Sequence, residues 1–70
     1  MEKDERERLL ILIDHWINHN QEHIDQYLSW AQKMEEGDLK DVAYRLKDAS
    51  DLISQANREF SAAKEALAWA

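Results

Sequence analysis

Three histidines stand at four-residue spacing in the first half of this 70-residue chain: His15, His19 and His23. On an α-helix, residues four positions apart lie on the same face, so the three imidazoles would form one row. Two histidines at this spacing can chelate one ion from a single helix, and a carboxylate can complete the ligand set. Glu22 follows His19 by three positions, which places its carboxylate beside the row. The spacing therefore predicts a metal site formed by His15, His19, Glu22 and His23.

The available ligands restrict the metal. The chain has no cysteine, and imidazole with carboxylate suits Zn, Ni, Cu(II) or Fe better than Cu(I). The expected cofactor is therefore Zn, Ni or another divalent transition metal. A second interpretation of the histidine row stays open. Histidine is half apolar, so these side chains could instead be boundary residues that bond carboxylates on a neighbouring helix.

Catalysis is not expected from this sequence. It has no Ser or Cys nucleophile in a recognisable setting and no glycine-rich phosphate loop, and a thin helical bundle offers no large pocket. A di-iron bundle needs Glu-x-x-His pairs on facing helices, and no Glu precedes a histidine by three positions here. The sequence thus indicates a protein that is not an enzyme.

Composition predicts a folded, almost entirely helical chain. Hydrophobic residues make up 44% and charged residues 34%, with one Gly and no Pro. The net charge is −6 and the nine Lys and Arg residues are scattered, which argues against nucleic-acid binding. No apolar run is long enough to span a bilayer, and the sequence starts with charges of both signs. We therefore expect a cytoplasmic location and no membrane partner.

The first helix is expected over about residues 3–36. Its apolar residues follow alternating three- and four-residue steps, the heptad pattern of helices that pack along a seam. The seam comprises Leu10, Ile13, Ile17, Asn20, Ile24, Tyr27, Ala31 and Met34. A second apolar line beside it comprises Leu9, Leu12, Trp16, His23 and Trp30. The two lines together are wider than one neighbouring helix can cover, so the first helix should contact more than one helix.

The turn is expected at residues 37–38. Gly37, the only glycine, suits the left-handed position that ends a helix, and Asp38 suits the N-cap of the next one. So short a connection makes the two helices antiparallel neighbours. The expected register places His23 near Asp51, His19 near Gln55 and His15 near Glu59.

The second helix is expected over about residues 39–67. Its predicted seam comprises Leu39, Val42, Leu46, Ala49, Ile53, Ala56, Phe60, Ala63 and Leu67. Asn20 in the first seam should form a hydrogen bond that sets the register, to Asn57 or Ser54 of the second helix or to its own symmetry mate.

The predicted fold is all-α: an antiparallel two-helix hairpin that forms a single domain over residues 1–70. An isolated hairpin would leave Leu12, Trp16, Trp30 and Leu52 partly exposed, a larger apolar patch than monomers usually present. We therefore expect a homodimer in which two hairpins form a four-helix bundle.

The pattern His-Trp-x-x-His-Asn-x-x-His, from His15 to His23, resembles a stretch of small uncharacterised prokaryotic helical-hairpin proteins. The resemblance extends over about sixteen residues, His15 to Trp30, and it implies no activity.

Two functions follow as hypotheses. The first is a small non-enzymatic binding protein that holds a transition metal through the histidine row. The alternative is an acidic helical adaptor or inhibitor that docks a partner protein through its Trp-bearing apolar face.

Overall fold

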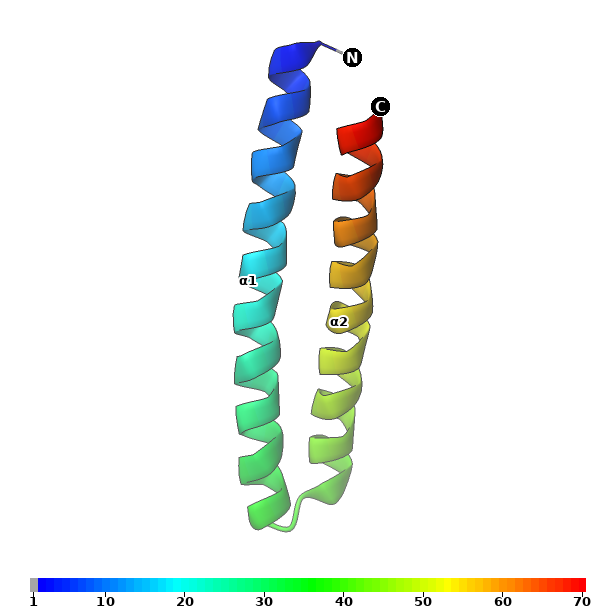
Figure 1. Ribbon diagram of the computed structural model, residues 1–70. Coiled ribbons are helices and arrows are strands. Elements are labelled where there is room, and N and C mark those ends of the chain that lie inside the picture. The colour runs from blue at the N-terminus through cyan, green and yellow to red at the C-terminus, as the bar shows by residue number, and fades with distance from the viewer. Residues whose placement is uncertain (1) are drawn as a thin grey trace.

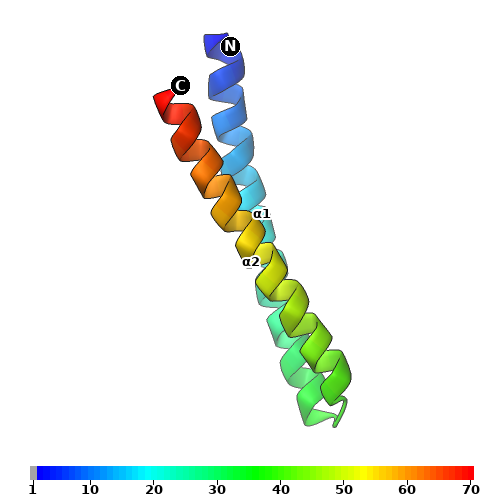
Figure 2. The same ribbon diagram turned by 90° about the vertical axis from the view of Figure 1, so that its right-hand side faces the viewer.

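Two long helices joined by a tight turn make up the computed structural model, which describes residues 2–70 (Figure 1). Helix α1 is Lys3–Glu36 and helix α2 is Lys40–Trp69. They run antiparallel, and Figure 2 shows α2 passing in front of α1 once, at a shallow angle, near the middle of the hairpin. The all-helical hairpin and the bounds of α1 agree with the sequence prediction. Within the described residues, neither helix offers an apolar stretch of the length that a bilayer requires.

The turn differs from the predicted one. Gly37 has a negative φ (φ −84°, ψ 8°), whereas Asp38 has a positive φ of 63°, in the left-handed region. The N–H of Asp38 donates to the carbonyl of Glu35 at 3.1 Å, and the N–H of Leu39 donates to that of Met34 at 2.7 Å. This pair of bonds is a Schellman motif, in which the residue at C′ is left-handed. Asp38 holds that position, so it cannot be the N-cap of α2; the N-cap residue is Leu39, without a side-chain cap.

The seam predicted for α1 is confirmed. All eight of its residues are buried or half-buried, and the most enclosed are Ile13, Ile24 and Ala31. They face α2 because their heptad spacing keeps them on one side of a helix that supercoils with its neighbour.

The seam predicted for α2 is confirmed in part. Leu46, Ile53, Phe60 and Leu67 are half-buried, as are Ala49 and Ala56, but Leu39, Val42 and Ala63 are exposed. A second line, one residue later, also turns toward α1. It comprises Ala43 and Ser50, which are buried, and Asn57 and Lys64, which are half-buried. The α2 helix is therefore rotated relative to the prediction.

The register is also shifted. Asn20 Nδ2 donates to Asn57 Oδ1 at 3.0 Å, and Asn57 Nδ2 donates to the Ile17 carbonyl at 3.2 Å. The expected bond between Asn20 and Asn57 is thus confirmed. However, the expected register had placed Asn20 opposite Ser54, three residues away. The residues expected opposite the histidines, Asp51, Gln55 and Glu59, are therefore also displaced by about three positions along α2.

Arg6 ties the open end of the hairpin together. Its guanidinium donates to the Leu67 carbonyl, at 3.1 Å from Nε and 2.8 Å from Nη2, and also to the Ala70 carbonyl. The last carbonyls of a helix have no partner within it and carry the negative end of the helix dipole. A cationic side chain from α1 therefore satisfies the C-terminus of α2.

Candidate functional site

One long edge of the hairpin is apolar. On α1, four large residues recur every seven positions, each directly before a seam residue. They are Leu9, Trp16, His23 and Trp30. On α2, the corresponding residues are smaller: Val42, Ala49, Ala56 and Ala63. In an antiparallel pair these two edges lie on the same side of the seam. Together with Leu12 and Leu52, which adjoin them, we call these residues the apolar face.

Much of the apolar face is exposed to solvent. Leu52 is 62% exposed, Trp30 is 54% exposed, and Leu12 and Trp16 are each 39% exposed. The predicted exposure of these four residues in a single hairpin is therefore confirmed. Lys33 lies over the Trp30 ring, with its Nζ 4.5 Å from the ring centroid, and covers only one side of it.

The opposite edge is polar, and two ion pairs join the helices there. The Nζ of Lys64 lies 2.6 Å from the Oδ1 of Asp14, and the Nζ of Lys47 pairs with the Oε1 of Glu35. All four side chains are about half exposed, so each pair contributes little to stability. The hairpin thus has two different sides: one closed by ion pairs and the other apolar.

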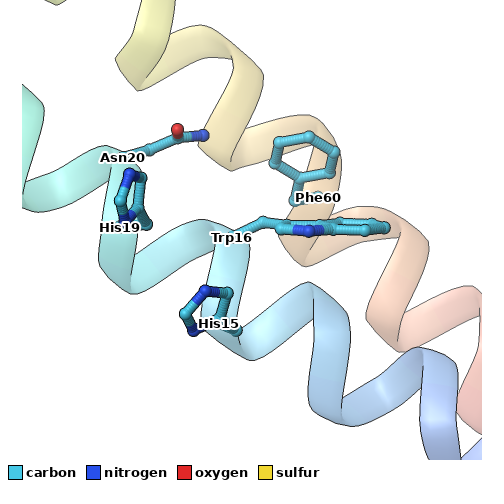
Figure 3. A pocket seen from close by; sticks show the side chains of 5 residues that line it. All are labelled: His15, Trp16, His19, Asn20 and Phe60. Atoms are coloured by element: carbon cyan, nitrogen blue, oxygen red, sulfur yellow. The ribbon is translucent and has the colours of Figure 1, made fainter.

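The middle of the apolar face is hollowed. The indole of Trp16 packs against the Phe60 ring with centroids 5.7 Å apart, and Figure 3 shows the two rings side by side between the helices. An open hollow there is lined by His15, Trp16, His19, Asn20 and Phe60. It is formed by large side chains that have no third helix to pack against.

The histidine row runs along the rim of this hollow. The His15 and His19 ring centroids are 5.9 Å apart, and those of His19 and His23 are 4.6 Å apart. His23 also stacks on Tyr27, with centroids 5.8 Å apart. Successive turns of α1 therefore bring the imidazoles together in pairs, as the four-residue spacing predicts.

Glu22, the carboxylate among the four predicted ligands, does not complete a metal-binding set within one chain. Among residues 2–70, no three His, Cys, Asp or Glu side chains form a group that could hold a metal ion. Glu22 is exposed and lies on the same outer side of α1 as His15. One hairpin can therefore offer a pair of imidazoles, and further ligands would have to come from water or another molecule.

The sequence prediction misplaced part of the site. Val42, Ala49, Ala56 and Ala63 were assigned to the seam, and they belong to the apolar face. Polar residues distinguish the line of α2 that lies in the seam from the neighbouring line on the apolar face. Asn57 can lie in the seam because Asn20 of α1 bonds to it, and Lys64, beside the seam, pairs with Asp14 of α1.

A protein family covers nearly the whole hairpin. Residues 9–67, from Leu9 on the apolar face to Leu67 beside Arg6, match a family described as a domain of unknown function, DUF8180. A search of curated proteins found no match, and a search of solved structures found none either. The matched segment includes most of both helices, the turn and the histidine row, and the chain belongs to the DUF8180 family.

Proposed function

We propose that this chain is a small non-enzymatic binding protein that acts as a homodimer, with the apolar face of each hairpin covered by a second copy. The observation that carries the proposal is the apolar face itself, with Trp30 and Leu52 more than half exposed. Contiguous apolar surface of this kind marks an interaction site in proteins that are not membrane-bound.

The total surface supports a partner of about this size. The hairpin exposes 5580 Å², whereas a compact monomer of its mass would expose about 4,600 Å². The excess is about 1,000 Å², close to the roughly 800 Å² that each partner buries in a standard interface. A second hairpin laid on the apolar face would remove about that area.

The charge of the chain does not prevent a second copy from docking. The chain carries a net charge of −6, and an acidic partner would be repelled by acidic surroundings. However, the ion-paired side chains lie on the edge away from the apolar face, and exposed charges beyond about 10 Å are largely screened at 0.1 M salt. Two apolar faces can therefore meet with their charged edges turned outward.

Two matched substitutions test the dimer. Leu52 lies on the apolar face and Ile11 lies outside it, and both are highly exposed in the single hairpin (62% and 70%). Leu52→Glu should lower the melting temperature and make the chain monomeric, because it would bury a carboxylate at the interface. Ile11→Glu should leave both properties unchanged. Equal behaviour of the two variants would contradict the proposal, and the adaptor hypothesis, in which a different protein covers the face, would then replace it.

Metal binding by the histidine row is a second candidate function. It is favoured by the adjacent imidazole pairs, of which His19 and His23 are the closest at 4.6 Å between centroids. His19 belongs to both pairs, so it is the residue on which the site depends. With only two imidazoles together in one chain, the expected metal is Zn or Ni held with water or with ligands from the second copy.

The test is thermal unfolding at pH 7.5 with and without Zn or Ni. A metal bound only to the folded form at a hundred times its dissociation constant should stabilise it by about 2.7 kcal/mol. His19→Ala should abolish this shift. Gln26→Ala, one heptad further along α1 and also exposed, should retain it. A wild type that does not respond to either metal, or a shift that persists in His19→Ala, would overturn this candidate.

A further inference from the structure

The two helices contribute unequal side chains to the apolar face. The α1 edge is a ridge of large residues, with Trp16 and Trp30 fourteen positions apart. The α2 edge is lower, because three of its four residues are alanines: Ala49, Ala56 and Ala63. The face is therefore bulky along one helix and shallow along the other.

The register determines which residues of the two helices lie at the same height. Trp16 contacts Phe60, and Asn20 contacts Asn57. Trp16 is thus level with the segment that includes Phe60 and Ala63. Trp30 lies ten residues after Asn20. Because the helices are antiparallel, it is level with the residue ten positions before Asn57, which is close to Ala49. Each tryptophan of α1 has an alanine of α2 near its own level.

A symmetric dimer can bring two such faces together in two ways. With the two-fold axis parallel to the helices, α1 of each copy lies against α2 of the other, at the same height. With the axis across the helices, α1 lies against α1 and α2 against α2. The second arrangement sets ridge against ridge and alanines against alanines. It would leave a gap of unequal width, which the close packing of protein interiors does not tolerate.

We propose that the second copy docks with the two-fold axis parallel to the helices, so that Trp16 and Trp30 of each chain pack beside the alanines of the partner's α2. This inference rests on the proposed homodimer and specifies its geometry. Each helix then has two antiparallel neighbours, and each tryptophan fills the space above a small residue. Both turns lie at the same end of the bundle.

The distance between the two turns tests this geometry. The chain has no cysteine, so Glu36→Cys, at the exposed end of α1, gives one nitroxide label per copy. Pulsed electron spin resonance should find the two labels within about 30 Å of each other, since packed helices lie about 8–10 Å apart. With the axis across the helices, the labels would be at opposite ends of a hairpin that is 53 Å long.

A second label separates the failure of this inference from the failure of the dimer. Asn18 is exposed near the middle of α1, where both arrangements give a short distance. A short distance for Asn18→Cys with a distance near 53 Å for Glu36→Cys would overturn the parallel axis and leave the dimer intact. The absence of coupling between copies at both sites would overturn the dimer as well.

Discussion

At the scale of single residues, the turn depends on two neighbours with different backbone conformations. Asp38 has φ 63°, a conformation that costs little only for glycine and, to a lesser degree, for Asn and Asp. Gly37 has φ −84°, which any residue can adopt. A β-carbon added at Gly37 would meet the carbonyl oxygens of Lys33 at 3.4 Å and Met34 at 3.7 Å, both ordinary contacts.

We therefore expect Gly37→Ala to raise the free energy of unfolding by about 0.4–1 kcal/mol, because it restricts the unfolded chain without straining the folded one. Asp38→Gly should also stabilise, by up to about 1 kcal/mol, because it relieves the left-handed position. Urea denaturation of both variants checks the signs. A loss of stability in Gly37→Ala would mean that the glycine, and not the aspartate, needs the left-handed conformation.

Ser50 is the one enclosed polar residue among the buried positions of the described chain. Its side chain is 2% exposed, and its hydroxyl has no hydrogen-bond partner within residues 2–70. An unsatisfied buried hydroxyl costs about 1–3 kcal/mol. Removing it should therefore stabilise the hairpin.

Ser50→Ala is expected to raise the free energy of unfolding by about 1–2 kcal/mol, because it removes the unpaired oxygen and leaves the methyl-sized packing in place. The matched control is Ser61→Ala, at an exposed position of the same helix, which should stay within about 0.5 kcal/mol of the wild type. If Ser50→Ala destabilises the protein, the hydroxyl has a hydrogen-bond partner outside the hairpin, such as a bound water or a second chain.

At the scale of the elements, the sequence predicted the helices well and their rotation poorly. The bounds and seam of α1 could be predicted because one long heptad pattern separates its apolar and polar sides. For α2, two neighbouring lines fit a heptad. Apolarity alone favoured Val42, Ala49 and Ala56, whereas the structure places Ser50 and Asn57 in the seam.

The choice between those two lines depends on contacts between helices, which a pattern within one helix does not contain. Asn57 pairs with Asn20, and Lys64 reaches Asp14 from its seam position. The prediction of the metal site was limited in the same way. The spacing within α1 correctly predicted adjacent imidazoles, but it could not show whether a third ligand from elsewhere would join them.

Arg6 gives the elements a testable connection at the open end. Arg6→Ala should fray the last turn of α2 and lower stability by about 1 kcal/mol, because the carbonyls of Leu67 and Ala70 lose a charged donor. Hydrogen exchange should become faster at the last amides of α2 and remain unchanged near the turn. Arg8→Ala, which removes an exposed charge on the same helix, is the control and should leave exchange unaffected.

At the scale of the whole molecule, the hairpin is long and its core is thin. The radius of gyration is 16.0 Å, compared with about 11 Å for a compact domain of the same length. Ile13 and Ile24 are the only large apolar side chains of the described residues that are buried. The core is small and the apolar face is exposed. Both observations support the proposal that the folded unit is a pair of hairpins.

The proposed dimer would also account for the arrangement of α2. With a second copy on the apolar face, the line through Val42, Ala49 and Ala56 would be covered by the partner, and the line through Ser50 and Asn57 by α1 of its own chain. Each apolar line of each helix would then have a neighbour. In an isolated hairpin, the more apolar line would be left partly exposed to solvent.

The central claim is that a second copy covers the apolar face, and sedimentation equilibrium of the unmodified chain tests it most directly. At micromolar concentration we expect a mass of twice the 8.3 kDa chain, with a melting temperature that rises with protein concentration, because dimer formation is linked to folding. A well-folded species of 8.3 kDa whose melting temperature is the same at every concentration would contradict the account.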